Sequence, residues 1–467
     1  MPMAPYQNKN NHAAPFITTG LILLCSALLF GLLAAIQYIV PGWGRDTFSF
    51  EKLRPLHVSS AVFWIIAGAM GTVLTYLQEH NQQPLKNRAL VKWQFYLFAT
   101  SFAGVLISYF FGVFSGREYW EFHPLFAIPI TIGWILFIIN FTTNHLKLKG
   151  APVYVWMWFT GAVFFLFTYL ESNLWLIPGV RNHLVKDMTI QWKSYGSMVG
   201  AWNQLIYGSS IYLMDKIAGN KKYSHSPIAF GLYFLGLFNL MFNWGHHIYT
   251  LPAHAAIQYI AYIVSMTELY LFGRIIYLWK SSVTTARKNI HIRPFQFLLS
   301  ADIWVFMTLG LAIAMSVPVL NLYMHGTHVI VAHTMGATIG INSLLLLAFA
   351  YDMAGSQGEV MTRNKKLIDR GIVLTNISLF VFWLALIIAG FMKSFWQMSD
   401  TTEPFGAMML RLQPYFRVFY IAGLGLATGL GMVIYPLLKK QWTKRLTRNT
   451  ASEFSGGSYQ EKAVEIA

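Results

Sequence analysis

Four histidines lie inside long apolar stretches of this 467-residue sequence: His57, His246, His247 and His333. Ionisable side chains in such stretches are costly to bury and are generally kept for function. Imidazole is the commonest metal ligand among side chains, and its neutral form tolerates a dry site. A single buried histidine can simply bond a neighbouring carbonyl group. Four at one depth of a membrane would instead predict a buried metal or haem centre.

Three carboxylates could contribute chemistry as well. Glu118 and Glu121 are three residues apart in one loop, and such a pair can bind a hard cation such as calcium through oxygen ligands. The alternative is a solvated loop in which Arg117 pairs with a glutamate. Glu268 lies in the middle of another apolar stretch, where a carboxylate is costly unless it is protonated, paired or hydrated. We expect Glu268 to transfer protons or to support a neighbouring site, unless it only pairs with Arg274.

Membrane-spanning helices are needed to position these residues. Hydrophobic residues make up 55% of the chain and charged residues 11%, which is about half the charged share of a soluble protein. Apolar runs of about 20 residues recur, and they predict an all-α, polytopic bundle of twelve transmembrane helices. The domains are a polar N-terminal tail (1–14), the membrane domain (15–438) and a basic, then flexible, tail (439–467). The predicted spans are 15–40, 55–78, 91–113, 123–143, 152–176, 191–214, 226–249, 254–279, 295–317, 325–350, 371–393 and 414–438.

The charge distribution orients the bundle in the bilayer. The net charge is +16, and Lys and Arg cluster in the tails and in every second loop. This asymmetry is the positive-inside pattern of membrane proteins, so it predicts cytoplasmic termini and no nucleic-acid partner. In that orientation the four histidines fall within roughly the outer third of the membrane, because a helix rises about 1.5 Å per residue. They are therefore predicted to share one depth.

Local spacing refines the possible roles of these side chains. His333 and Met335 are two residues apart, about 200° around a helix, so one helix could serve two cofactors. His246 and His247 are about 100° apart, and both could reach one metal if the helix end is distorted at Gly245.

Three further residues limit the kind of centre. His325 and His328 fall at or above the outer boundary of the tenth span, where we expect them to be interfacial or to support the site. The only cysteine is Cys25. A disulfide framework, a thiolate metal cluster and a covalent c-type haem motif are thereby excluded.

These features resemble the catalytic subunit of the haem-copper oxidase superfamily. The greatest likeness is to the large subunit of the cytochrome c-dependent nitric oxide reductases, with the C-family oxygen reductases next. The resemblance covers about residues 22–438, and it rests on Leu53-Arg54-Pro55-Leu56-His57 followed by Phe63-Trp64, Gly116 to Glu121, Gly245-His246-His247, Ser265 to Glu268, and His325-Gly326-Thr327 through His333.

The resemblance implies a set of cofactors and ligands. It implies two non-covalent b-type haems, one non-haem metal that is iron or copper, and a calcium ion as a further candidate. It assigns the low-spin haem to His57, the high-spin haem to His333, the non-haem metal to His246 and His247, the calcium to Glu118 and Glu121, and a place near the active site to Glu268.

Two departures from the family pattern affect these assignments. In the family's tenth helix a second histidine completes the low-spin haem, and here Met335 takes that position. A thioether is a good iron ligand that raises the haem potential, although a buried methionine can also only pack.

The sixth span lacks the family's third metal histidine and offers Tyr195, Gly196 or Ser197 instead. Tyr195, or His183 from the preceding loop, could complete the site. Otherwise it is loose, holds copper(I) or is empty.

Two functions follow from the resemblance. The first is an oxidoreductase of the bacterial inner membrane that converts nitric oxide, or a related N–O or O2 substrate, at the His333 haem. Its electrons would come from a separate cytochrome c-type subunit. The glutamate loop and Glu268 favour an N–O substrate. The second function is a non-catalytic haem subunit for electron transfer or gas sensing. A transporter is disfavoured, because few spans are broken at mid-membrane.

Overall fold

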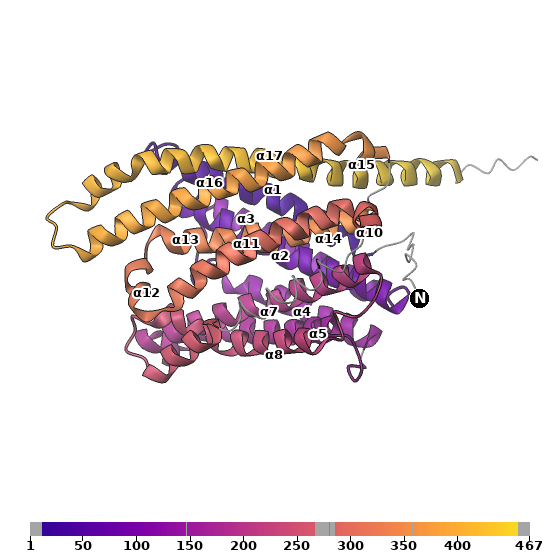
Figure 1. The fold of residues 1–467 in the computed structure, drawn as a ribbon, viewed down its shortest axis with the longest axis horizontal. Helices are drawn as coiled ribbons and strands as arrows, with labels where there is room; N and C mark the ends of the chain where they lie inside the picture. The colour runs from indigo at the N-terminus through magenta and orange to yellow at the C-terminus, as the bar shows by residue number, and fades with distance from the viewer. Residues whose placement is uncertain (1–11, 146, 267–279, 281–284, 356–358, 456–467) are drawn as a thin grey trace, which may run out of the picture.

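The structure, a computed structural model, describes residues 12–145, 147–266, 280, 285–355 and 359–455, and its regular elements there are helices (Figure 1). The long helices are α1 (Ala14–Ala35), α2 (Phe50–Asn81), α3 (Arg88–Phe110), α4 (Ala127–Asn144), α5 (Val153–Glu171), α7 (Leu184–Ala218), α8 (Pro227–Phe242), α11 (Ile292–Ser316), α14 (Leu344–Ala354), α16 (Lys365–Met398) and α17 (Phe405–Ser455). The shorter elements are η1 (Ile36–Tyr38), η2 (Pro124–Phe126), η3 (Leu174–Leu176), α6 (Pro178–Arg181), η4 (Asn243–Ile248), α10 (Thr285–Ile290), α12 (Pro318–Met324), α13 (His328–Met335), η5 (Gly336–Ser343) and α15 (Glu359–Arg363).

The polytopic, all-helical architecture predicted from the sequence is confirmed. Ten helices of the described part are long and apolar enough to cross a membrane. The two predicted spans outside this set are 191–214, which lies within the more polar helix α7, and 254–279. The second of these is described only as far as Met266, as the apolar helix Ala255–Met266. The total of twelve therefore stays a prediction.

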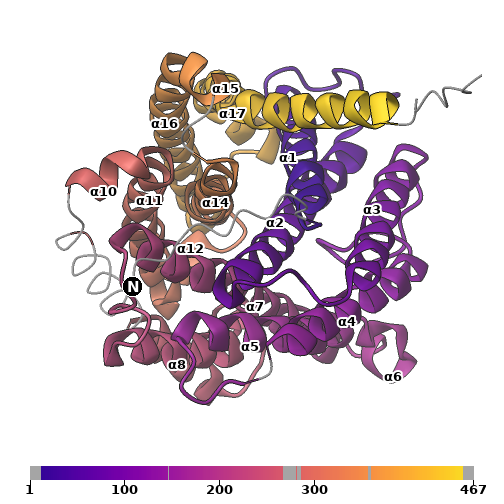
Figure 2. The same cartoon turned by 90° about the vertical axis from the view of Figure 1, so that its right-hand side faces the viewer.

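Helix α2 lies at the centre of the bundle. Viewed along the bundle, α2, α7 and α14 lie nearest the middle, and α3, α4, α8 and α16 surround them (Figure 2). In an 18-residue apolar stretch of α2, 89% is buried, whereas the corresponding stretch of the span Pro227–Ile248 is only 28% buried. Small residues allow this enclosure: a Cβ on Gly71 would lie 2.8 Å from Ile17, and one on Gly68 would lie 3.1 Å from Leu346.

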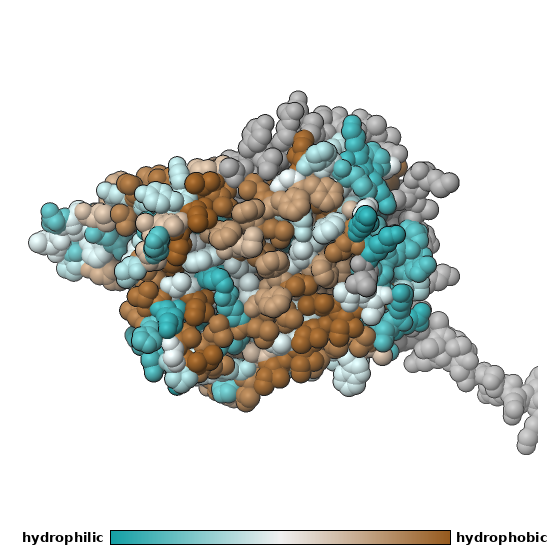
Figure 3. Space-filling model, turned by 90° about the horizontal axis from the view of Figure 1, so that it is seen from below, coloured by the Kyte–Doolittle hydropathy of each residue, from teal (hydrophilic) through white to brown (hydrophobic). Residues whose placement is uncertain are grey.

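The surface matches a bilayer environment. On the face shown in Figure 3, apolar residues cover much of the middle, and hydrophilic residues gather toward the two ends. Large apolar side chains such as Phe167, Phe234 and Ile421 are exposed. Lipid tails would cover such a surface, because a soluble protein rarely exposes contiguous apolar area of this extent.

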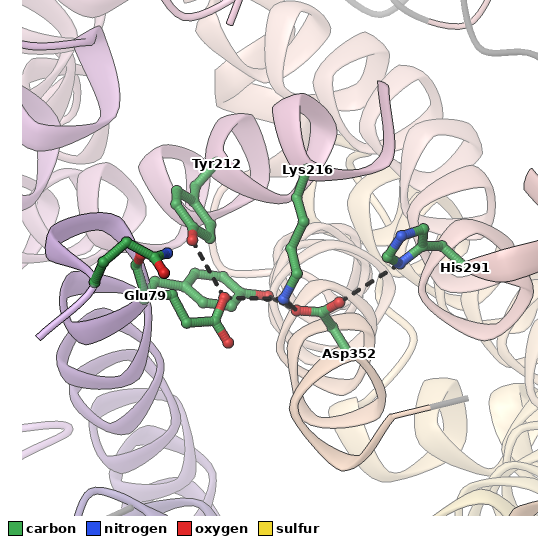
Figure 4. Close-up of polar contacts among 7 residues, drawn as sticks. Glu79, Tyr212, Lys216, His291 and Asp352 are labelled. Carbon is green, nitrogen blue, oxygen red and sulfur yellow. Dashed lines mark hydrogen bonds and ion pairs between the residues drawn. The ribbon is translucent and has the colours of Figure 1, made fainter. Parts of the chain in front are cut away.

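A network of charged side chains joins three helices at one end of the bundle. Lys216 of α7 donates to Glu79 of α2 at 2.9 Å and to Asp352 of α14 at 2.8 Å (Figure 4). The Tyr212 hydroxyl donates to the same Glu79 oxygen at 3.2 Å, and the Tyr76 hydroxyl donates to Asp352 at 3.1 Å. We call these five residues, with His291 at 3.8 Å from Asp352, the Lys216 cluster. The single positive charge of Lys216 can balance only one of the two carboxylates, Glu79 and Asp352.

The C-terminal helix extends beyond its predicted span. The sequence placed a tail from residue 439 onward, whereas α17 continues to Ser455. The basic residues after the apolar run therefore prolong a helix. The tail was expected to be flexible from Asn449, but residues 449–455 are helical, and residues 456–467 lie outside the described residues.

Candidate functional site

One cavity of about 550 Å³ brings together the residues singled out from the sequence. Its walls come from α1, η1, α2, α7, η4, α11, α13, η5, α16 and α17. It is lined by His57, Met335, His333, His246 and His247. Residues from separate predicted spans thus converge, as their common depth predicted. His325 and His328, expected at the boundary, line the same cavity.

His57 is held in an orientation suited to binding a metal. Its Nδ1 lies 2.7 Å from the carbonyl oxygen of Ala27 in α1. A carbonyl only accepts, so Nδ1 carries the proton and Nε2 keeps its lone pair. Ligating histidines typically donate their other ring N–H in this way. Gly31 makes room for the ring, because a Cβ there would lie 2.7 Å from His57 Nδ1. The site therefore fits an iron ligand at His57.

His333 and Met335 lie at a change in helix geometry. Helix α13 ends at Met335, and the π-helix η5 begins at Gly336. Such π segments are rare and are frequent at functional sites. Gly336 packs so closely against α11 that a Cβ would lie 2.4 Å from the Thr308 hydroxyl oxygen. The buried His333 ring lies against the backbone of Thr308 in α11. Both His333 and Met335 border the single cavity, so it reaches both sides of this helix.

His246 and His247 lie in the short 3₁₀ helix η4. The change to 3₁₀ geometry here is the distorted helix end that was expected at Gly245. Their ring centroids are 4.2 Å apart, with planes inclined at 46°. Gly245 fits against Ile257, where a Cβ would lie 2.7 Å from the side chain and 2.9 Å from the backbone oxygen. His246 Nδ1 lies 3.0 Å from Asn243 Oδ1, which also accepts from Ser265. This contact sets the His246 tautomer with Nε2 as an acceptor.

The sixth predicted span does not bring Tyr195 to the histidine pair. The Tyr195 ring packs edge-on against Tyr119 at 5.7 Å and lines a separate small pocket with Trp120 and Tyr169. Trp192 of the same helix contacts the histidine pair instead. Its ring stacks on that of His247, with ring centroids 5.2 Å apart and an interplanar angle of 16°. The structure therefore does not support Tyr195 as a ligand of a metal at His246 and His247.

Within the part of the chain that the structure describes, no other side chain completes this site. His183 lies exposed at the start of α7, outside the cavity lining. Among the described residues, no three His, Cys, Asp or Glu side chains are arranged to hold a metal ion. The geometry fits haem ligands better than a three-ligand non-haem metal centre.

The two loop glutamates share one arginine at the cavity edge. Arg54 Nη1 donates to Glu121 Oε1 at 2.9 Å, and Arg54 Nη2 donates to Glu118. Burial raises the pKa of Glu121, and the Arg54 charge opposes that rise. Arg117 pairs with Asp187 at 2.6 Å, which corrects the alternative Arg117–glutamate pair. A calcium ion at Glu118 and Glu121 stays a prediction.

Several residues that shape the site were not among those singled out from the sequence. Arg54 precedes His57 by three positions on α2, so helical spacing could have placed it beside that histidine. Trp192 carried no such signal, because aromatic residues are common in apolar helices, and the role of Asn243 depends on its contact with His246. Glu268 and Arg274 lie outside the described residues, so the role of Glu268 stays a prediction.

Comparisons with known proteins agree with this geometry. The family model described as "Cytochrome C and Quinol oxidase polypeptide I" matches residues 12–425. A nitric oxide reductase subunit of Stutzerimonas stutzeri is 23% identical over 460 residues, covering 91% of this chain and 93% of the relative. Cytochrome c oxidase subunit 1 of Rhodobacter capsulatus is 22% identical over 421 residues, covering 85% and 79%. A haem-copper terminal oxidase dimer solved by cryo-electron microscopy matches with a TM-score of 0.72 at 15% identity, covering 93% of this chain and 84% of that one.

Proposed function

Because the chain belongs to the cytochrome c and quinol oxidase polypeptide I family, the haem-copper oxidases, we propose that it is a haem-containing membrane oxidoreductase that converts nitric oxide. A related N–O compound or O2 is the alternative substrate. The observation that carries the proposal is the single cavity bordered by His57, His333 and the His246–His247 pair. The cavity thus places the residues that would hold two haems beside a pair of imidazoles.

The cavity residues would hold two b-type haems. In this proposal His333 would bind the high-spin haem, and His57 with Met335 would bind the low-spin haem. A bound haem iron would supply a coordination site for a diatomic gas and pass on the electrons that reduce it. Arg54 lines the cavity, where its guanidinium already pairs with the carboxylates of Glu118 and Glu121. The ring of His57 is already oriented through Ala27. Any second metal would bind at His246 and His247.

Nitric oxide is favoured over O2 by two features. The nitric oxide reductase relative aligns over nearly the whole chain. The chain also retains the Glu118–Glu121 loop and Glu268, which the nitric oxide reductase resemblance predicts. We propose that a cytochrome c-type subunit donates the electrons and that Glu268 assists proton delivery. The proposed location is the bacterial inner membrane with both termini in the cytoplasm.

The test combines haem quantitation with anaerobic nitric oxide consumption by the purified protein, with reduced cytochrome c as donor and O2 uptake measured in parallel. The expected result is haem-dependent loss of nitric oxide. The variant His333→Ala should lose the high-spin haem and the consumption. The control His183→Ala, at an exposed position outside the cavity, should keep both. Full haem content in His333→Ala would show that another residue binds this haem.

The second candidate is a non-catalytic haem subunit for electron transfer or gas sensing. It is favoured by one observation, the placement of Tyr195 away from the histidine pair without a replacement ligand among the described residues. Stoichiometric haem with no turnover of either gas would support this candidate and contradict the enzyme.

A further inference from the structure

The face of α7 toward the histidine pair has no room for a third metal ligand. Gly196 is the α7 residue packed against η4: a Cβ there would lie 2.7 Å from Trp244 Cβ, 3.1 Å from Trp244 Cα and 3.7 Å from His247 Cδ2. A histidine at this position would collide with Trp244 Cβ and crowd its Cα. Its neighbours Tyr195 and Ser197 are buried, and neither borders the cavity.

One turn before Gly196, the side chain facing the cavity is an indole. Trp192 lies nearly parallel to the His247 ring at 5.2 Å, while the His246 ring approaches at 4.2 Å. Stacking of this kind is favourable and fixes ring orientation. Trp192 therefore occupies the position from which α7 could reach the histidine pair. Its indole nitrogen can only donate a hydrogen bond and offers no lone pair to a metal.

The two histidines differ in what they can offer a molecule in the cavity. His246 directs Nδ1 to Asn243, which leaves Nε2 as an acceptor. The His247 ring, by contrast, makes no hydrogen bond in the described part of the chain, and a neutral imidazole always carries one N–H. His247 is thus the member of the pair that can donate to a bound gas.

From these contacts we infer that the cavity works with haem and without the adjacent non-haem metal of its family, and that His247, oriented by Trp192, donates a hydrogen bond to the gas bound at the haem. This inference rests on the proposed function for the haem itself. Two histidines hold a divalent metal much less firmly than three, and the third position is closed. The imidazole pair then serves as the polar wall of a mononuclear haem site.

The first experiment measures non-haem metal on the full-length protein after dialysis against Fe(II) and, separately, Cu(I). Iron beyond the haem iron, and copper, should both stay far below one atom per chain. One tightly held atom per chain that disappears in His246→Leu would overturn the inference. If that atom also disappeared in His325→Asn, the third ligand would be His325, which borders the same cavity. Haem content and gas consumption are measured separately, so failure of the proposed function is distinguished from failure of this inference.

The second experiment reads the hydrogen bond directly through the C–O stretching frequency of carbon monoxide bound to the reduced haem. A donor at the oxygen lowers this frequency, so His247→Leu should shift it to higher wavenumber at unchanged haem content. Trp192→Leu should shift it in the same direction, because the ring loses its orientation. The control is Tyr195→Phe, next to Gly196 but outside the cavity, which should leave the frequency unchanged. An unshifted band in His247→Leu would overturn the hydrogen-bonding role.

Discussion

At the scale of single residues, the absence of a side chain at Gly31 gives the His57 ring the room that it needs to serve as a haem ligand. In Gly31→Ala the new Cβ would lie 2.7 Å from His57 Nδ1, so the ring must leave the Ala27 carbonyl. We expect loss of the low-spin haem, measured as haem per chain and as the low-spin absorption band. The matched control is Gly310→Ala in α11, where a Cβ meets nothing within 4 Å. Equal low-spin haem in both variants would mean that His57 is not its ligand.

Met335 can be tested by restoring the ligand that the family has at this position. A thioether ligand raises a haem potential relative to a second imidazole, so Met335→His should lower the midpoint potential of the low-spin haem. Spectroelectrochemical titration of both proteins measures the difference. An unchanged potential would identify Met335 as a packing residue at the edge of the cavity.

At the scale of helices, the Lys216 cluster holds α2, α7 and α14 together. Glu79 follows His57 by 22 residues on α2, about 33 Å of helix, so the cluster lies at the end of the bundle away from the cavity. The side chains of Lys216, Glu79 and Asp352 are only 17%, 18% and 3% exposed. Removing the shared cation in Lys216→Met leaves two buried carboxylates without a counter-charge, which costs about 3–5 kcal/mol.

That loss should appear as a lower thermal unfolding midpoint in detergent. The comparison is Arg411→Gln, which breaks the Arg411–Glu403 pair at a 50%-exposed arginine and should cost about 0–1 kcal/mol. If both variants unfolded at the wild-type temperature, the cluster would not be a structural link between the three helices.

The Lys216 cluster could not be predicted from the sequence, whereas the four histidines could. The four histidines could be found because each is anomalous within an apolar run, and a common depth follows from helix rise and loop charge alone. Glu79, Lys216 and Asp352 lie at helix ends more than a hundred positions apart, where charged residues are ordinary. Their pairing depends on which helices are neighbours. The same holds for Trp192, since only the packing of α7 against η4 turns an ordinary aromatic residue into the partner of His247.

At the scale of the whole molecule, the bundle has two ends of different character, and their orientation in the membrane can be tested. The cavity and the loop that contains Ser115 lie at one end, and the basic start of α16 with Lys366 lies at the other. Lys and Arg are retained on the cytoplasmic side, so we expect the cavity to open toward the outer face. The chain has one cysteine, Cys25. The substitution Cys25→Ser therefore gives a background without thiols for site-specific labelling.

In that background, Ser115→Cys should react with a membrane-impermeant maleimide on intact spheroplasts, because Ser115 is exposed in the loop after α3. Lys366→Cys, also exposed, should react only after permeabilisation. Gas consumption by each variant confirms that the labelled protein is folded. The reverse labelling pattern would place the histidine cavity toward the cytoplasm. Electrons from an external cytochrome c would then have to cross the bundle past the Lys216 cluster, so the orientation also constrains which donor can serve this protein.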